Sequence, residues 1–191
     1  DDPVCKHIPE FRLYDEWITE RVTVRDLLCH RLGLERAQRL YYHRGYDQHE
    51  MMRRMQYLRP KFNFRTQFQY ANQQFGVAGL LVEAVSGKSW DDFITDRLFN
   101  PLGMSRSHSG YDRVTDLQNF ASPHAVLDET YPASVRFLGE TRPVEQYRII
   151  HEPAGSIHTS ANDLAKWLKI LLQNGAPILE ASTFNELITP Q

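Results

Sequence analysis

The stretch that follows Tyr70-Ala71-Asn72 constrains the fold of this chain more than any other feature of its sequence. Its apolar residues lie on nearly every side of a predicted helix and are Phe75, Val77, Ala78, Leu80, Leu81, Ala84 and Val85. A helix that is hydrophobic all round has to be buried. Gly76 and Gly79 would let another backbone approach closely, and Gly87 ends the helix. We therefore predict a deeply buried helix whose first turn adjoins the Tyr-x-Asn triplet.

Length and composition are those of one soluble globular domain. The chain has 191 residues, of which 41% are hydrophobic and 24% charged, and this length is enough to bury a substantial core. Its longest uncharged apolar stretch, residues 77–82, is much shorter than a membrane span. The formal net charge of -2 gives no electrostatic reason to expect a nucleic-acid or membrane partner.

The other predicted helices are set by capping residues. Side chains at Thr23, Asp47, Ser89 and Ser160 precede helical patterns, and the corresponding stops are Gly33, Pro60, Pro101 and Asn174-Gly175. These signals predict helices over 24–31, from 48 toward Pro60, from 90 toward Pro101 and from 161 to about 173, with a last short helix over 182–188. Asp15, Glu16 and Trp17 are predicted as surface loop. The chain is thus expected to be mainly α.

Residues 105–153 lack strong periodicity of either kind. Short runs that favour strands occur at 134–138 and 146–150, separated by Gly139 and Pro143. So long an irregular stretch in a compact domain more often lines a site than merely connects two elements. Candidates there for ligand contact are Tyr111, Asp112, Arg113 and the pair His151-Glu152, with ordinary loop polarity as the competing interpretation.

Cysteine and histidine patterns give no metal site. Cys5 and Cys29 could form one disulfide, although free thiols are favoured, and no Cys/His spacing of a zinc site is present. His49-Glu50 is followed by Met51, Met52 and Arg53, so the HExxH pattern fails. No cofactor is predicted. Eight arginines between 31 and 65 favour a solvated charged face over a surface that binds an acidic partner.

Tyr70 and Asn72 are the candidate catalytic residues. A hydroxyl that gives or takes a proton and an amide that donates and accepts hydrogen bonds stand two residues apart, and side chains two apart in extended backbone lie on one face. Phenol is normally a weak base, and a nearby lysine ammonium would favour its ionised form. Spacing alone leaves open a second interpretation, in which Asn72 caps the helix and Tyr70 packs beside it.

Five blocks in chain order carry a resemblance to a known family. They run from Asp1-Asp2-Pro3-Val4 through Ile8-Pro9-Glu10-Phe11, then Val22-Thr23-Val24-Arg25-Asp26-Leu27-Leu28 with His30-Arg31-Leu32-Gly33-Leu34, Phe68-Gln69-Tyr70-Ala71-Asn72 with Gly76 and Ser86-Gly87, Pro101-Leu102-Gly103-Met104, and Pro153-Ala154-Gly155-Ser156-Ile157 with Thr159-Ser160-Ala161-Asn162-Asp163-Leu164. The ordered set resembles the serine β-lactamase, DD-peptidase and esterase family, which includes the class C β-lactamases. It spans nearly the whole chain.

The resemblance implies the fold and assigns roles to two residues. In the family, Ser-x-x-Lys supplies the nucleophile, Tyr-x-Asn helps to move protons and steadies the lysine and the substrate amide, and Lys/His-Thr/Ser-Gly completes the site. Only the second motif maps here, onto Tyr70 and Asn72, and His158-Thr159-Ser160 lacks the glycine of the third. The implied fold is the helical lobe of the β-lactamase/transpeptidase-like α/β fold, with the central antiparallel sheet largely missing. Residues 1–191 would form a single partial domain.

The implied activity is that of a serine hydrolase acting on amide or ester bonds through an acyl-enzyme. Its substrate would be a small molecule or a peptide, and the two unmatched motifs are expected outside this segment, so the segment alone should not catalyse. The alternative is a catalytically inactive relative that acts as a peptide- or protein-binding module. A periplasmic or secreted location is expected from the resemblance.

Overall fold

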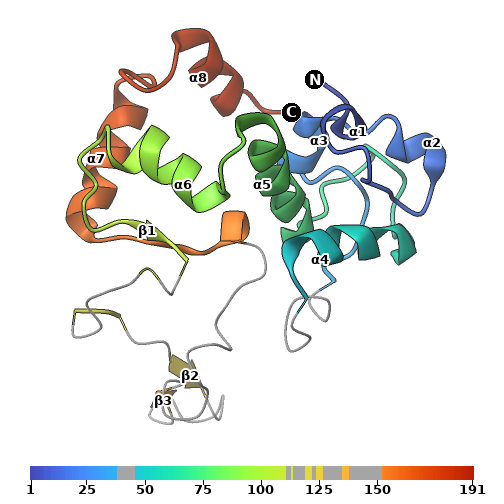
Figure 1. The fold of residues 1–191 in the computed structure, drawn as a ribbon, viewed down its shortest axis with the longest axis horizontal. Helices are drawn as coiled ribbons and strands as arrows, with labels where there is room; N and C mark the ends of the chain where they lie inside the picture. The colour runs from blue at the N-terminus through green and yellow to red at the C-terminus, as the bar shows by residue number, and fades with distance from the viewer. Residues whose placement is uncertain (38–45, 111–112, 114–118, 122–123, 127–134, 138–151) are drawn as a thin grey trace.

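The computed structural model describes residues 1–37, 46–110, 113, 119–121, 124–126, 135–137 and 152–191. These residues are mainly helical (Figure 1). In chain order, the helices are α1 (Val4–His7), α2 (Glu16–Thr19), α3 (Val24–Leu28), α4 (Gln48–Arg54), the 3-10 turn η2 (Met55–Tyr57), α5 (Asn72–Ser86), α6 (Trp90–Ile94), the π-helical turn η3 (Thr95–Phe99), the 3-10 turn η7 (Glu152–Ala154), α7 (Ala161–Leu172) and α8 (Ala181–Ile188).

Helix α5 lies at the centre of the described elements. Figure 1 shows α1 to α4 on one side of it and α6 to α8 on the other, and α5 contacts α1, α3, α4, α6 and η7. Its glycines provide the close approaches, since a Cβ at Gly79 would overlap the ring of Pro153. The Gly76 carbonyl accepts a hydrogen bond from the Gln48 side chain at 2.5 Å. The prediction of a deeply buried helix is confirmed as far as Leu81, whereas Ala84 and Val85 of the last turn are exposed.

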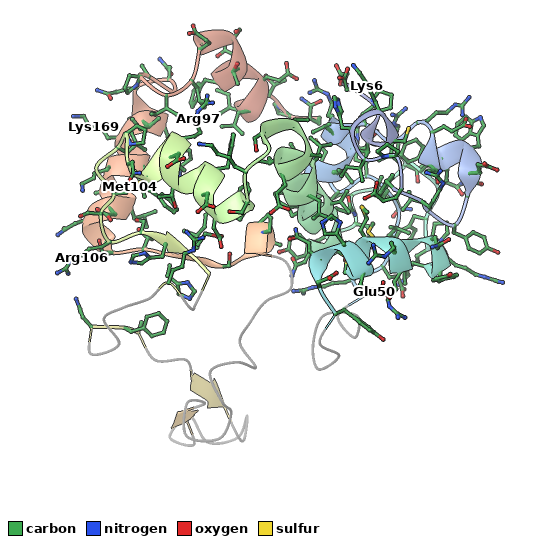
Figure 2. The ribbon with its side chains drawn as sticks, in the orientation of Figure 1. Lys6, Glu50, Arg97, Met104, Arg106 and Lys169 are labelled. Carbon is green, nitrogen blue, oxygen red and sulfur yellow. The ribbon has the colours of Figure 1, made fainter. Side chains whose placement is uncertain are left out.

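Two hydrophobic cores flank α5. The larger combines α1, α3, α4 and one side of α5, and its buried members are Val4, Ile8, Phe11, Leu13, Val22, Leu27, Leu32, Leu34, Met51, Met52, Met55, Val77, Leu80 and Leu81. The smaller is formed by Ile94, Phe99 and Met104 with Trp167 of α7 packed against them (Met104 is labelled in Figure 2). Met51, Met52 and Met55 are fully buried in the larger core.

Two small antiparallel sheets complete the described structure. Strand β1 (His108–Ser109) pairs with β4 (Ile157–His158), with His108 opposite His158. Strand β2 (His124–Val126) pairs with β3 (Val135–Phe137). Strand β3 falls within the run predicted over 134–138, whereas the run over 146–150 lies outside the described residues.

Capping predictions hold where the cap is local. The side chains of Thr23, Asp47, Ser89 and Ser160 each accept the backbone N–H three residues ahead. These four helices therefore begin where the sequence indicates.

Two predictions in the first third of the chain are wrong. The helix predicted over 24–31 ends at Leu28, because the chain already turns into the left-handed conformation at His30, with φ 55°, three residues before Gly33. The predicted loop at Asp15, Glu16 and Trp17 instead contains α2, which the Asp15 side chain caps by accepting the Ile18 N–H. One-turn helices like this have too few residues for a periodic pattern.

Gly33 and Gly87 provide a matched test of backbone crowding, because their φ angles are 70° and 69°. A Cβ at Gly33 would overlap the Phe62 carbonyl, whereas a Cβ at Gly87 would have no atom within 4 Å. Alanine at Gly87 should destabilise the fold by about 1–2 kcal/mol through the left-handed backbone alone. Alanine at Gly33 should lose about 1–3 kcal/mol more through overpacking. Urea unfolding of the full-length protein measures both, and equal losses would contradict the packing at Gly33.

Candidate active site

Tyr70 stands at the start of α5 with its ring partly open to solvent. Its exposed fraction is 44%. Ala71 is the N-cap residue of α5, with extended backbone at φ -155° and ψ 116°, and Asn72 is the first helical residue. The interpretation in which Asn72 caps the helix is therefore wrong, because no side chain caps α5.

Asn72 keeps its amide available. Its side chain is half-buried, and it makes no hydrogen bond within the part of the chain that the structure describes. An exposed phenol and an uncommitted carboxamide thus stand on either side of one extended residue. Such a pair can exchange a proton and hold a polar substrate group at the same place.

His30 contacts Tyr70 and Ala71 of the Tyr-x-Asn triplet. Its ring is buried, with 6% exposed, and lies 4.7 Å from the Tyr70 ring, 5.4 Å from Phe68 and 5.1 Å from Phe75, measured between centroids. Its Nδ1 accepts the Ala71 N–H at 3.3 Å. Burial lowers the pKa of His30 below its ordinary value. Sequence reasoning missed this residue, and the only available signal was its place in the block His30-Arg31-Leu32-Gly33-Leu34.

The segment that carries Tyr70 is tied to the turn after α3 by backbone hydrogen bonds. We call residues 61–71 the 61–71 segment. The N–H of Lys61 donates to Gly33 O at 2.9 Å, that of Arg65 to Arg31 O at 2.8 Å, and that of Gln69 to His30 O at 2.9 Å. The position of Tyr70 therefore depends on the path of the chain between α3 and Gly33.

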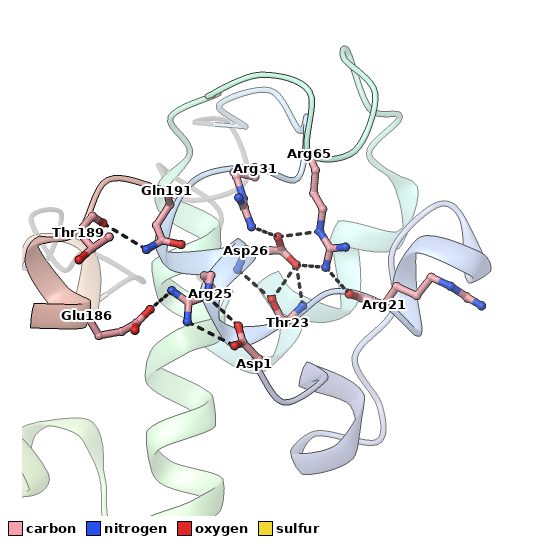
Figure 3. A network of polar contacts seen from close by, with 10 residues as sticks. All are labelled: Asp1, Arg21, Thr23, Arg25, Asp26, Arg31, Arg65, Glu186, Thr189 and Gln191. Atoms are coloured by element: carbon pink, nitrogen blue, oxygen red, sulfur yellow. Dashed lines mark hydrogen bonds and ion pairs between the residues drawn. The ribbon is translucent and has the colours of Figure 1, made fainter. Parts of the chain in front are cut away.

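Asp26 joins the 61–71 segment to the turn after α3 (Figure 3). Its buried carboxylate accepts hydrogen bonds from Arg65 at 2.7 Å and from Arg31 at 3.0 Å, and it also accepts the Thr23 hydroxyl and N–H. Burial alone would raise the pKa of Asp26, but the hydrogen bonds from Arg65, Thr23 and Arg31 outweigh it and lower the pKa to about 2. A buried carboxylate with this many donors remains charged at neutral pH.

Arginine side chains of the basic stretch are largely occupied by neighbours. Arg36 lies over the Tyr70 ring, 5.1 Å from its centroid. Arg53 and Arg54 both pair with Glu50 of α4. A guanidinium over an aromatic face is attractive and restricts the ring. Arg36 is thus a second neighbour of Tyr70 that sequence reasoning did not single out.

Of the candidates from the irregular stretch, the structure describes Arg113 and the backbone of Glu152. Arg113 pairs with Asp92 at 3.2 Å and with Asp91 at 3.6 Å, at the start of α6. Tyr111, Asp112 and His151 lie outside the described residues, and Glu152 begins η7. An open hollow of about 600 Å³ is lined by residues of this region and of β4, among them Ser105, His108 and His158. Neither Tyr70 nor Asn72 lines it.

Cys5 and Cys29 are both free thiols, as favoured from the sequence. Within the described residues, no helix combines the length and apolar character that crossing a bilayer requires.

This architecture, in which helices pack on both sides of the central α5, is that of the helical lobe of the β-lactamase/transpeptidase-like fold. The Beta-lactamase family model matches residues 1–191. The chain belongs to the β-lactamase family.

Solved structures agree on the fold. A penicillin-binding protein homologue from Pyrococcus abyssi superposes with a TM-score of 0.79 at 24% identity, over 99% of this chain and 42% of that one. A D-stereospecific amidohydrolase from Streptomyces sp. gives a TM-score of 0.78 at 22% identity, over 100% of this chain and 58% of that one. Among sequences, an unguisins hydrolase from Aspergillus campestris is 27% identical over 93% of this chain. The chain spans 33% of the length of that relative.

Acid should weaken the fold through Asp26. Because its pKa is about 2 in the folded state against 3.8 ordinarily, the stabilisation is complete above pH 3.8 and is lost as the pH falls toward 2. The difference corresponds to about 2 kcal/mol. The free energy of unfolding of the full-length protein, measured in urea, should therefore decrease between pH 5 and about pH 2 by this amount more in the wild type than in Asp26→Asn.

Glu10→Gln, at an exposed carboxyl, is the control. Its free energy of unfolding should depend on pH as that of the wild type does. If the free energy of unfolding of Asp26→Asn depended on pH as in the wild type, the carboxylate would not be held as Figure 3 shows it.

Proposed function

We propose that this chain is the helical lobe of a serine hydrolase that cleaves an amide or ester bond through an acyl-enzyme. The observation that carries the proposal is the arrangement at the start of α5, where the Tyr70 phenol is 44% exposed and the Asn72 amide caps nothing. A purely structural Tyr-x-Asn triplet would be expected to bury the phenol or to use the amide as a cap.

The roles of the two residues follow from their chemistry and from the family resemblance. A serine hydroxyl, from a Ser-x-x-Lys motif outside this segment, would attack the substrate carbonyl carbon and form an acyl ester as the amine or alcohol leaves. The Tyr70 oxygen would pass the serine proton to that leaving group, and the Asn72 amide would hold the substrate amide. Water would then attack the acyl ester, releasing a carboxylic acid and restoring the serine.

Membership of the β-lactamase family and the presence of hydrolases among the relatives support hydrolysis. The named relatives include an unguisins hydrolase and a D-stereospecific amidohydrolase. We propose amides of D-amino acids, β-lactams and simple esters as the panel of substrates to compare, because the site described here provides general proton transfer and amide recognition.

The direct test is covalent labelling of the full-length protein with a fluorophosphonate or penicillin probe, read by intact mass. One adduct per chain on a serine of a Ser-x-x-Lys motif is expected, and heat-denatured protein should take up none. A full-length protein that contains no such serine and forms no adduct would overturn the proposal. That result would favour the inactive peptide- or protein-binding module.

Tyr70→Phe in the full-length protein tests the assigned tyrosine. Loss of a proton-transferring group typically lowers the rate about 10²–10⁴-fold, so kcat for ester or amide hydrolysis should fall within that range. The unfolding midpoint should barely change, because phenylalanine keeps the ring contacts with His30 and Arg36.

Tyr57→Phe is the matched control, since Tyr57 of η2 is 74% exposed and should tolerate loss of its hydroxyl. If Tyr70→Phe retained wild-type turnover, Tyr70 would not be the catalytic tyrosine.

A further inference from the structure

We propose that His30 is a positioning residue for the Tyr-x-Asn pair, acting through a neutral imidazole that accepts the Ala71 N–H and packs against the Tyr70 ring. The proposal rests on the proposed function for its kinetic readout. His30 touches no substrate in this scheme, and its effect is to fix where the phenol and the carboxamide stand.

The first argument is that His30 holds the triplet at two points. Its Nδ1 accepts the N–H of Ala71, the residue between the two candidate catalytic side chains, and its ring lies 4.7 Å from the ring of Tyr70. Its carbonyl oxygen also accepts the Gln69 N–H, which fixes the residue before Tyr70. Three consecutive residues, Gln69, Tyr70 and Ala71, are thus each in contact with His30.

The second argument is that Ala71 has no substitute for this bond. Ala71 is fully buried, and a buried N–H without an acceptor destabilises the folded state. In the described structure, the His30 ring is the acceptor for that N–H. Because Ala71 is also the N-cap residue of α5, losing the bond would loosen the backbone on which both side chains depend.

The third argument is the backbone of His30 itself. A non-glycine residue with a φ of 55° is in an unfavourable backbone conformation. Such conformations persist where the surroundings enforce them, and they concentrate at functional sites. Here, the left-handed turn lets the carbonyl meet Gln69 while the side chain reaches Ala71. Glycine would relieve the backbone but would remove the acceptor and the ring.

The hydrogen bond requires one protonation state. Nδ1 accepts only in the neutral imidazole that carries its proton on Nε2, because both nitrogens are donors in the cation. Burial lowers the pKa of His30, so the neutral form is maintained at neutral pH. The contribution is complete above the ordinary value of 6.5, and it is lost as the pH falls through the lowered pKa.

Among the described residues, few ionisable groups lie near the His30 ring. On the 61–71 segment the Tyr70 phenol is in contact with it, and the Arg36 guanidinium lies over the same phenol. Helix α5 contributes the apolar Phe75. On the side of His30 itself, Arg31 pairs with the buried carboxylate of Asp26. Protonation of His30 would therefore place a cation among aromatic rings and an arginine pair, with no unpaired carboxylate among these neighbours to compensate.

The test compares His30→Asn with His30→Leu in the full-length protein. Asparagine places an acceptor, Oδ1, close to the position of Nδ1 and tolerates positive φ, whereas leucine has a similar branched shape without an acceptor. We expect His30→Leu to lower kcat by at least about tenfold, equivalent to about 1.4 kcal/mol of barrier. We expect His30→Asn to retain kcat within about threefold at pH 7.5.

The pH profile separates positioning from a general loss of stability. In the wild type, kcat should fall on an acid limb whose midpoint lies below 6.5. That limb should be absent or shifted further to acid in His30→Asn, because asparagine does not titrate. An unchanged acid limb in His30→Asn, or wild-type kcat in His30→Leu, would overturn the proposal. If His30→Leu does not fold, the asparagine profile decides alone.

Nitrogen-15 NMR of histidine-labelled full-length protein gives a readout that needs no turnover. The His30 signals, assigned by their loss in His30→Asn, should show an unprotonated Nδ1 that titrates below 6.5. A protonated Nδ1 at neutral pH would refute the positioning bond even in an active enzyme. Conversely, an unprotonated Nδ1 in a protein that no probe labels would refute the proposed hydrolase and leave the bond intact.

Discussion

Burial of α5 between two cores is the constraint on which the rest of the structure depends. The helix has α4 on one side, joined through Gly76 and Gln48, and Pro153 of η7 against Gly79 on another. Since α5 begins at Asn72, whatever fixes the helix also fixes the first residue of the candidate site. A side chain at Gly79 would overlap Pro153, so it would displace the helix and move Asn72 with it.

The preceding residue, Tyr70, is fixed by a different mechanism. Hydrogen bonds between the 61–71 segment and the turn from His30 to Gly33 hold the chain that leads into α5, and the buried carboxylate of Asp26 joins the two stretches through Arg31 and Arg65. Buried charge of this kind is unfavourable unless every partner is in place, so it selects one arrangement of the two stretches. Polar contacts thus position the phenol, whereas apolar packing positions the carboxamide.

Local patterns in the sequence were sufficient for many of the elements. The caps at Thr23, Asp47, Ser89 and Ser160 depend on hydrogen bonds from the third residue ahead. Both partners of such a bond lie within one short stretch of sequence, so the cap can be predicted from that stretch alone. The end of α3 was not predicted, because glycine at 33 is the stronger signal for a left-handed residue and histidine at 30 is a weak one. The structure places both in that conformation.

The sequence by itself determined the buried helix, the Tyr-x-Asn triplet at its start and the family to which the ordered motifs point. The tertiary structure alone decided that the Tyr70 ring is partly exposed, that Asn72 caps nothing, and that His30 accepts the Ala71 N–H. The physical reason is the sequence separation of the interacting residues. Helical periodicity and caps act within a few residues, whereas the bonds from His30 to Ala71 and from Arg65 to Asp26 join residues 41 and 39 positions apart. Contacts at that separation depend on the path of the whole intervening chain.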